Sequence, residues 1–263
     1  MEVKLSKNKT KITAIIEARS NSKRLPNKVL LPVLKKPILL HLIERLKLSK
    51  KIEQIVIATS KNKKDDKIEN FCKKNKISFF RGSENNVRKR VYLTAKKFKA
   101  DPIVQITGDC PLIDPNIVDK VITKYFSNNY DCVSNIFKRS FPDGMDVMVF
   151  SFKSFNKINN ICTKLNEKIY NEHTGLFFIH NYKKFKIKNI LAPLNVRFPS
   201  LGLTLDEKKD FLLIEKIFKY FKKKKINFNC IDIVKLVHSN KKLYNINKHI
   251  IRKKIPSKKI KLI

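Results

Sequence analysis

The stretch IVQITGDCPLID, residues 103–114, joins an apolar strand to a polar loop that carries two carboxylates. Its first five residues are typical of a buried β-strand, the glycine ends that strand, and Asp109 and Asp114 follow. Because Pro115 suits a first helical turn and Asp114 suits the position before it, we expect a helix over 115–126 with Asp114 as its cap. The stretch therefore predicts a strand, a polar loop and a helix in immediate succession.

The same alternation occurs three times before this stretch. Apolar strands are expected at 12–18, 54–59 and 77–80, and they are followed by helices at 37–47, 64–74 and 86–99. This alternation predicts an α/β fold with a mainly parallel sheet covered by helices on both faces. Because ligands bind beyond the carboxyl ends of strands in such sheets, we expect the loops at 19–28 and 108–114 to line one cleft.

The second half of the chain is expected to extend the same domain. The patterns predict strands at 131–135, 145–150 and 185–191, helices at 170–181 and 207–222, and an FPDG turn at 141–144. The remainder is rich in lysine but keeps helical spacing of apolar residues at 231–237. We therefore predict one domain over 1–255, with a core at 11–222, a helical cap at 223–255 and a flexible tail at 256–263.

The composition restricts the possible partners. The chain has 263 residues and a formal net charge of +37, from 59 Lys and Arg against 22 Asp and Glu. The lysines are scattered, Arg is rare and no aromatic residues interleave with a basic stripe, so we expect no nucleic-acid partner. Five cysteines without metal-binding spacing, and the lack of an apolar run that could cross a membrane, indicate a cytoplasmic protein without membrane association.

The loop that follows the first predicted strand is strongly cationic. Arg19, Lys23, Arg24 and Lys28 lie within ten residues of one another, together with two serine hydroxyls. Cations and backbone N–H groups beyond the end of a strand suit a triphosphate. An ordinary basic surface loop is the open alternative, and the loop lacks the spacing of a Walker motif.

Asp109 also allows two interpretations. An aspartate after a glycine is often a turn residue or a helix cap. It also suits Mg²⁺, which takes one or two carboxylates together with phosphate oxygens and waters. Asp206 has the same setting, at the end of a short apolar segment and before a predicted helix, so it is either a second ligand or another cap.

Seven segments in order give the chain a family resemblance. They are ARSNSKRLPNKVL (18–30), IVIATS (55–60), FRGSENNV (80–87), ITGDCPLIDP (106–115), FPDGMDVMVF (141–150), NEHTG (171–175) and LTLDEKKDF (203–211). Together they resemble the cytidylyltransferases of the spore coat polysaccharide SpsF type, which are similar to CMP-Kdo and CMP-sialic acid synthetases. The resemblance spans residues 11–222 and implies a Rossmann-like GT-A nucleotidyltransferase fold.

The resemblance also implies roles for individual residues and a homodimer. The implied nucleotide-binding residues are Ala18, Arg19, Ser22, Arg24, Lys28, Thr59, Arg81, Gly82 and Gly108. The implied catalytic residues are Arg19, Lys28 and Asp109, and Asp109 and Asp206 would hold Mg²⁺. The acceptor is expected to contact Asp143, Asp146, Glu172 and His173.

Two positions depart from the family pattern. Asn27 stands where relatives commonly have glycine, and asparagine can still adopt the left-handed conformation. Glu17 stands where glutamine or proline is usual, so it places a negative charge close to the predicted triphosphate site.

The resemblance implies the coupling of CTP to a Kdo-like or sialic-like sugar acid, which gives a CMP-activated sugar and pyrophosphate for surface polysaccharide synthesis. A GT-A glycosyltransferase that consumes a nucleotide sugar is an alternative, but it would be expected to carry Asp-x-Asp where this chain has Asp109 followed by Cys-Pro. A nonenzymatic polyanion-binding protein is favoured only by the bulk charge.

Overall fold

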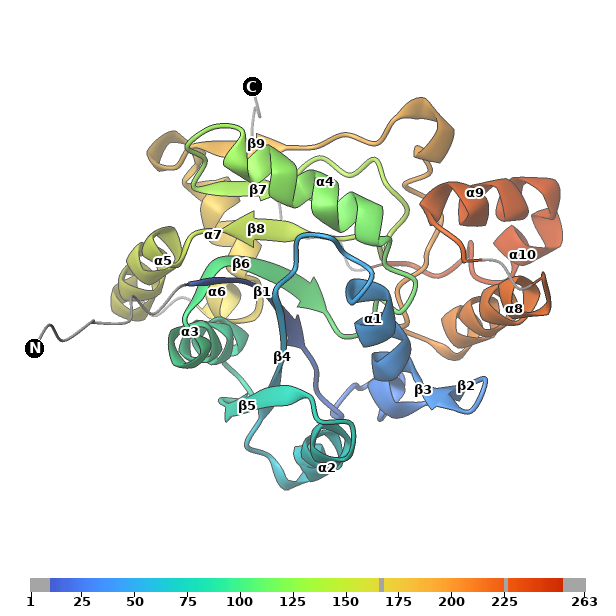
Figure 1. Cartoon of the computed structure of the whole chain (residues 1–263), viewed down its shortest axis with the longest axis horizontal. Coiled ribbons are helices and arrows are strands. Elements are labelled where there is room, and N and C mark those ends of the chain that lie inside the picture. The colour runs from blue at the N-terminus through green and yellow to red at the C-terminus, as the bar shows by residue number, and fades with distance from the viewer. Residues whose placement is uncertain (1–9, 166–167, 225–226, 253–263) are drawn as a thin grey trace, which may run out of the picture.

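A seven-stranded sheet forms the centre of the molecule, for which a computed structural model describes residues 10–165, 168–224 and 227–252. Along the sheet the strands are β5 (Ser78–Gly82), β4 (Gln54–Ser60), β1 (Lys11–Glu17), β6 (Ala100–Thr107), β8 (Met148–Phe150), β7 (Cys132–Ser134) and β9 (Ile187–Asn189) (Figure 1). Only β8 runs antiparallel to its neighbours. The predicted mainly parallel sheet is confirmed.

Helices pack on both faces of this sheet, as the sequence predicts. Side chains of β1 alternate between two apolar clusters, with Ala14 and Ile16 in one and Ile15 in the other. The first cluster contains α1 (Ile38–Leu46), α2 (Asp66–Lys74), α4 (Pro115–Phe126), α8 (Lys208–Lys224) and α9 (Cys230–Ser239). The second contains α3 (Val87–Phe98), α5 (Phe152–Leu165), α6 (Lys168–Glu172) and α7 (Thr174–His180).

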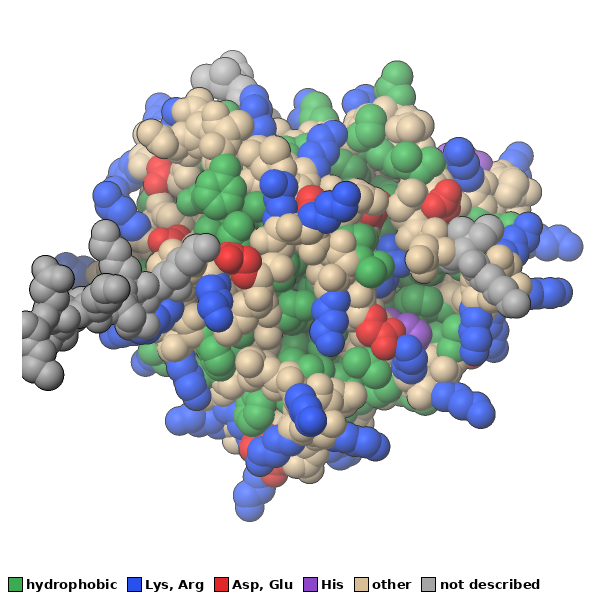
Figure 2. Space-filling model, viewed as in Figure 1, with side chains coloured by type: hydrophobic (Ala, Val, Ile, Leu, Met, Phe, Trp, Pro, Cys, Tyr) green, Lys and Arg blue, Asp and Glu red, His purple; other side chains and the backbone are tan. Residues whose placement is uncertain are grey.

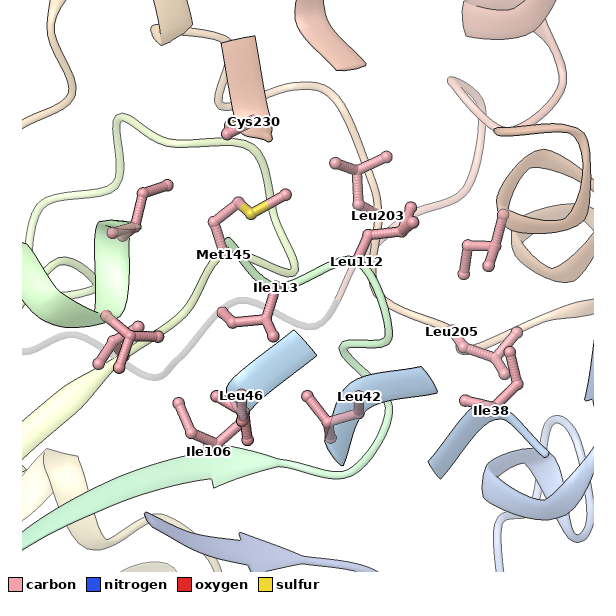
Figure 3. Close-up of a cluster of buried hydrophobic side chains, with 14 of the residues drawn as sticks. Ile38, Leu42, Leu46, Ile106, Leu112, Ile113, Met145, Leu203, Leu205 and Cys230 are labelled. Atoms are coloured by element: carbon pink, nitrogen blue, oxygen red, sulfur yellow. The ribbon is translucent and has the colours of Figure 1, made fainter. Parts of the chain in front are cut away.

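The loop after β6 is held by apolar side chains from several parts of the chain. Leu112 and Ile113 of this loop are fully buried. In Figure 3 they lie among side chains of α1 and of the segment that carries Leu203 and Leu205. The backbone N–H of Leu205 donates to the carbonyl oxygen of Asp109 over 2.8 Å. This core therefore fixes the two predicted metal-binding loops side by side.

Asp114 caps a helix, as the sequence predicts, and it has a second partner. One of its carboxylate oxygens accepts from the backbone N–H of Asn116 over 2.8 Å, in the first turn of α4. The other accepts from the backbone N–H of Cys230 over 2.8 Å, at the start of α9. Because a buried helix end needs a hydrogen-bond acceptor, Asp114 links the C-terminal helices to the sheet domain.

Several predicted elements differ from those observed. The helix expected at 170–181 is divided into α6 and α7, which meet at His173. Helix α5, the short helix α10 (Lys241–Asn245) and the hairpin of β2 (Pro32–Val33) and β3 (Lys36–Pro37) were not predicted. The predicted tail at 256–263 lies outside the described residues.

Cations are spread over the face of the molecule that Figure 2 shows. Figure 2 shows Lys and Arg side chains distributed over the viewed face, without one continuous stripe. No helix within the described ranges has the length and hydropathy that a membrane crossing requires.

Candidate functional site

The loop between β1 and α1 is folded back on itself by its own backbone and by one buried carboxylate. The backbone N–H of Asn27 donates to Ser20 O over 2.9 Å, and the backbone N–H of Ser20 donates to Asp65 Oδ1 over 2.6 Å. Asn27 has a φ of 56°, the left-handed conformation predicted for it. This turn directs the next residue, Lys28, toward the carboxyl ends of the strands.

Lys28 joins the two carboxylates that were predicted to bind metal. Its Nζ lies 2.5 Å from Asp109 Oδ2 and 2.9 Å from Asp206 Oδ1. Arg24 Nη2 lies 2.7 Å from the other carboxylate oxygen, Oδ2, of Asp206. Four predicted site residues from three distant segments are therefore in contact.

The charges of this cluster stabilise one another. Burial disfavours the charged form of Lys28, but the carboxylates of Asp109 and Asp206 outweigh it and raise the pKa of the ammonium. Burial also opposes ionisation of Asp206, but Lys28 and Arg24 outweigh it and lower the pKa of that carboxyl. Lys28 and Asp206 are therefore both charged near neutral pH.

Gly108 allows the two strand ends to approach closely. Its N–H donates to Glu17 O over 2.8 Å. A Cβ at this position would lie 2.7 Å from the same carbonyl oxygen, too close for any other residue without a backbone shift. Asp109 is therefore positioned by a glycine that packs against the end of β1.

A cleft of about 250 Å³ extends from these carboxylates and is lined by residues of six segments. All four predicted acceptor residues line it, namely Asp143, Asp146, Glu172 and His173. Ile136, Leu176 and Ile179 give one wall an apolar surface. The predicted metal-binding and acceptor-binding residues therefore face a common cavity.

Asp143 and Asp146, two of the residues predicted to bind the acceptor sugar, are paired with an arginine that was not predicted. Arg139 approaches Asp146 through two contacts of 3.1 and 2.8 Å, and its Nη1 lies 3.3 Å from Asp143 Oδ1. Burial raises the pKa of Asp146 to about 6, against the opposing effect of the Arg139 guanidinium. Arg139, Thr204 and Arg252 also line the cleft.

Glu17 lines the cleft and is partly buried. Burial raises the pKa of its carboxyl, while the nearby Arg90 guanidinium and the amide of Gln105, which donates to it, act in the opposite direction. The surroundings of Glu17 therefore favour the neutral form of its carboxyl more than water does.

The remaining predicted nucleotide-binding residues fall into two groups. Arg19 Nη2 lies 3.6 Å from Glu172 Oε1 across the cleft, and Ser22 Oγ accepts from a backbone N–H within the loop. Arg81 instead contacts Asp66, Glu69 and two backbone carbonyls, and Gly82 packs against the Arg90 side chain. The structure does not bring Arg81 or Gly82 to the carboxylate cluster.

Two further predicted positions lie at the ends of β1 and β4. Ala18 is buried, and its N–H donates to Ala58 O over 3.2 Å. Thr59 is fully buried, and its Oγ1 has no hydrogen-bond partner among the described residues. Their contacts with nucleotide stay predictions.

The donor set fits Mg²⁺. One ammonium nitrogen already contacts Asp109 and Asp206 together, so both carboxylates converge on a position where a cation is stable. The described ranges contain no group of three or more His, Cys, Asp or Glu side chains arranged for a metal. Two carboxylates are sufficient when phosphate oxygens and waters complete the coordination of Mg²⁺.

The sequence profile described as Cytidylyltransferase matches residues 13–251. The chain belongs to the cytidylyltransferase family. The match extends past residue 222, so the family pattern includes α9 and α10 as well as the sheet domain. The enzyme is therefore a nucleotidyltransferase, and the resemblance seen in its motifs is confirmed.

Two of the curated relatives match most of the chain, and a third matches less than half of it. The enzyme is 36% identical to an uncharacterized protein of Methanocaldococcus jannaschii, over 92% of this chain and 97% of that protein. It is 32% identical to the spore coat polysaccharide biosynthesis protein SpsF of Bacillus subtilis, over 79% of this chain and 86% of that protein. A 3-deoxy-manno-octulosonate cytidylyltransferase of Geobacter metallireducens is 31% identical over 43% of each chain.

Solved structures show the same fold. A cytidylyltransferase from Leptospira borgpetersenii superposes with a TM-score of 0.84 at 32% identity, over 93% of this chain and all of that one. A CMP:2-keto-3-deoxy-manno-octonic acid synthetase, solved as a complex with CTP, superposes with a TM-score of 0.58 at 14% identity, over 80% of this chain and 99% of that one. The predicted nucleotidyltransferase fold is confirmed.

Proposed function

We propose that the enzyme couples CTP to a sugar acid and releases pyrophosphate. The observation that carries the proposal is the contact of Lys28 with both Asp109 and Asp206, beside Arg24. A cationic loop and a pair of carboxylates at the carboxyl ends of parallel strands suit the neutralisation and alignment that phosphoryl transfer needs.

In the proposed reaction an acceptor hydroxyl oxygen attacks the α-phosphorus of CTP. A new phosphorus–oxygen bond forms, the bond between the α-phosphorus and the bridging oxygen breaks, and pyrophosphate leaves with that electron pair. The hydroxyl proton passes to water. The protein contributes alignment and charge neutralisation rather than a covalent intermediate.

The cations of the first loop are assigned to the phosphates. Arg19, Arg24 and Lys28 would stabilise the charge that builds on the leaving pyrophosphate. Mg²⁺, held by Asp109 and Asp206 when bound, would supply further charge neutralisation at the phosphate oxygens. Lys28 would then donate to phosphate oxygens in place of the two carboxylates that it contacts now.

The acceptor is assigned to the end of the cleft formed by Asp143, Asp146, Glu172 and His173. Carboxylates and an imidazole can accept hydrogen bonds from sugar hydroxyls. The apolar wall suits a deoxygenated carbon of the sugar. The relative named as a 3-deoxy-manno-octulosonate cytidylyltransferase supports a 2-keto-3-deoxy sugar acid.

A homodimer, which the family resemblance implies, and a cytoplasmic location, which the sequence indicates, remain part of this proposal.

The test is pyrophosphate release from CTP in the presence of Mg²⁺ and candidate sugar acids. Asp109→Ala is expected to reduce turnover by at least about 100-fold, because loss of one electrostatic contact to the transition state typically costs that much. Glu44→Gln, which changes a half-exposed carboxylate paired with Lys36, is the control and should retain turnover. Nearly full activity of Asp109→Ala would refute the assignment.

A further inference from the structure

Asp210 connects the C-terminal segment with the backbone of a predicted metal ligand. Its side chain is fully buried near the start of α8. One oxygen, Oδ2, accepts from the backbone N–H groups of Asp206 and Glu207 over 3.0 and 2.9 Å. The other, Oδ1, accepts from Asn247 Nδ2 and Arg252 Nη2, each over 2.7 Å. Asp210 is thus held from one side by residues that come after α10.

Arg252 also contacts Asp143, another residue that lines the cleft. Its Nε lies 3.3 Å from Asp143 Oδ2, while Thr204 Oγ1 donates to Asp143 Oδ1 over 3.1 Å. One guanidinium therefore contacts both Asp143, in the turn that also carries Asp146, and Asp210, the carboxylate that orients Asp206. Its side chain is only 20% exposed, and it lines the cleft.

Gly202 creates the space for this guanidinium. A Cβ at residue 202 would lie 1.8 Å from Arg252 Nη2. The backbone carbonyl of Gly202 accepts from Asn247 Nδ2 over 2.8 Å, and Leu203 N donates to Asp143 O over 2.6 Å. A substitution of Gly202 by alanine would therefore displace the Arg252 guanidinium without removing its charge.

We infer that Arg252 is a positioning residue of the active site, which locks the Asp143 turn and the Asp206 segment in one relative placement for the acceptor. The inference rests on the proposed function for its kinetic consequence, but its structural basis does not depend on the substrate. It assigns to the C-terminal segment a role in the reaction, where the sequence predicts only a helical cap. Asn247 supports the same arrangement through Asp210 and Gly202.

Two different substitutions should remove the same contact. Arg252→Ala deletes the guanidinium, and Gly202→Ala displaces it with a methyl group. Each is expected to raise the KM for the acceptor by about tenfold, within the range of coupling between contacting residues, and to change the KM for CTP by less than about twofold. Arg252→Lys should restore part of the acceptor affinity, since a lysine keeps the charge but loses the fork of donors.

The double variant that combines Arg252→Ala with Gly202→Ala shows whether the two substitutions raise the KM for the acceptor through one cause. Once the guanidinium is absent, the Gly202→Ala methyl group meets no obstacle from it, so the acceptor KM of the double variant should equal that of Arg252→Ala. Additive effects would show that Gly202 acts independently and would overturn the inference. Lys248→Ala, a change at an exposed lysine of the same segment, is the control and should leave both KM values unchanged.

Amide hydrogen exchange tests the arrangement without any substrate. The N–H groups of Asp143, Asp206 and Glu207 are hydrogen-bonded, so they should exchange slowly in the wild-type protein. In Arg252→Ala and in Gly202→Ala they should exchange about tenfold faster, while the amides of β1 and β4 keep their protection. Unchanged exchange in both variants would overturn the inference, as would faster exchange without a change in acceptor KM. If the wild-type protein releases no pyrophosphate with any acceptor, the proposed function fails while exchange still decides the structural role.

Discussion

Replacing Lys28 by methionine tests the charge cluster directly. The substitution keeps most of the length and apolar surface of the side chain and removes the ammonium. Asp109 and Asp206 would then face each other without the cation that they share, although Arg24 would still contact Asp206. We expect the unfolding free energy of the metal-free protein to decrease, because two like charges lose their common partner.

The size of the effect follows from burial. The Lys28 side chain is 12% exposed and the two carboxylates are 19% and 20% exposed, so the cluster lies between the surface and the interior. Exposed pairs contribute at most about 1 kcal/mol, and breaking a buried pair costs about 3–5 kcal/mol, so we expect a loss of about 2 kcal/mol. For a chain of this size that corresponds to a decrease in Tm of about 4–8 °C.

Thermal unfolding with and without Mg²⁺ is the assay. Added Mg²⁺ should raise the Tm of Lys28→Met more than that of the wild type, because no ammonium competes for the two carboxylates. Turnover should remain at least about 100-fold below wild type even with Mg²⁺, since the contact of Lys28 with the leaving group is lost. Lys36→Met, which removes an exposed pair with Glu44, should change Tm by less than about 2 °C. An unchanged Tm and near-normal turnover of Lys28→Met would refute the reasoning.

Three further perturbations test other parts of the site. Because the folded-state pKa of Asp146 is raised to about 6, the folded protein binds more protons than the unfolded chain between roughly pH 4 and 6. Stability should therefore fall as pH rises through that interval, and Asp146→Asn should flatten the profile in a denaturant titration; an unaltered profile would contradict the assignment. Asp65→Ala removes the buried acceptor of the Ser20 N–H, so it should lower stability by about 1–3 kcal/mol and raise the KM for CTP; an unchanged KM would show that the loop does not depend on this contact. Gly108→Ala places a methyl group against Glu17 O and should destabilise the protein by about 1–3 kcal/mol in calorimetry, whereas a neutral result would mean that β1 and β6 separate easily.

Much of the fold could be predicted because its signals are local. Short, continuous apolar runs alternate with helices of period 3.6, and this pattern predicts a parallel sheet covered on both faces. Asp109 and Asp206 share a local setting at the end of an apolar segment, which leaves metal ligand or helix cap open, and the family resemblance implies that they act as a pair. Helix α5 had the same kind of signal, with Phe152, Phe155 and Ile158 at helical spacing, although it was not among the predicted elements.

The positions of long cationic side chains could not be predicted from spacing. Arg81 lies at a strand end, and its ion pairs with carboxylates of the neighbouring helix α2 did not follow from spacing, while its contact with nucleotide stays a prediction. Lys28 is expected at a triphosphate, which stays a prediction, and its contacts with Asp109 and Asp206 did not follow from spacing. Arg252 lies 42 residues after Asp210, and their contact depends on how the C-terminal segment packs. Such contacts arise from tertiary structure, which local patterns do not encode.

The central claim is that the enzyme joins a cytidylyl group to a sugar acid. The most direct measurement is phosphorus NMR of a reaction that contains CTP, Mg²⁺ and each of a panel of sugar acids, with other nucleoside triphosphates as controls. We predict equimolar pyrophosphate and a CMP-sugar from CTP with one sugar acid, and neither product from Asp206→Asn or Asp109→Asn. Turnover that is independent of these two carboxylates, or the absence of pyrophosphate with every sugar acid, would contradict the account.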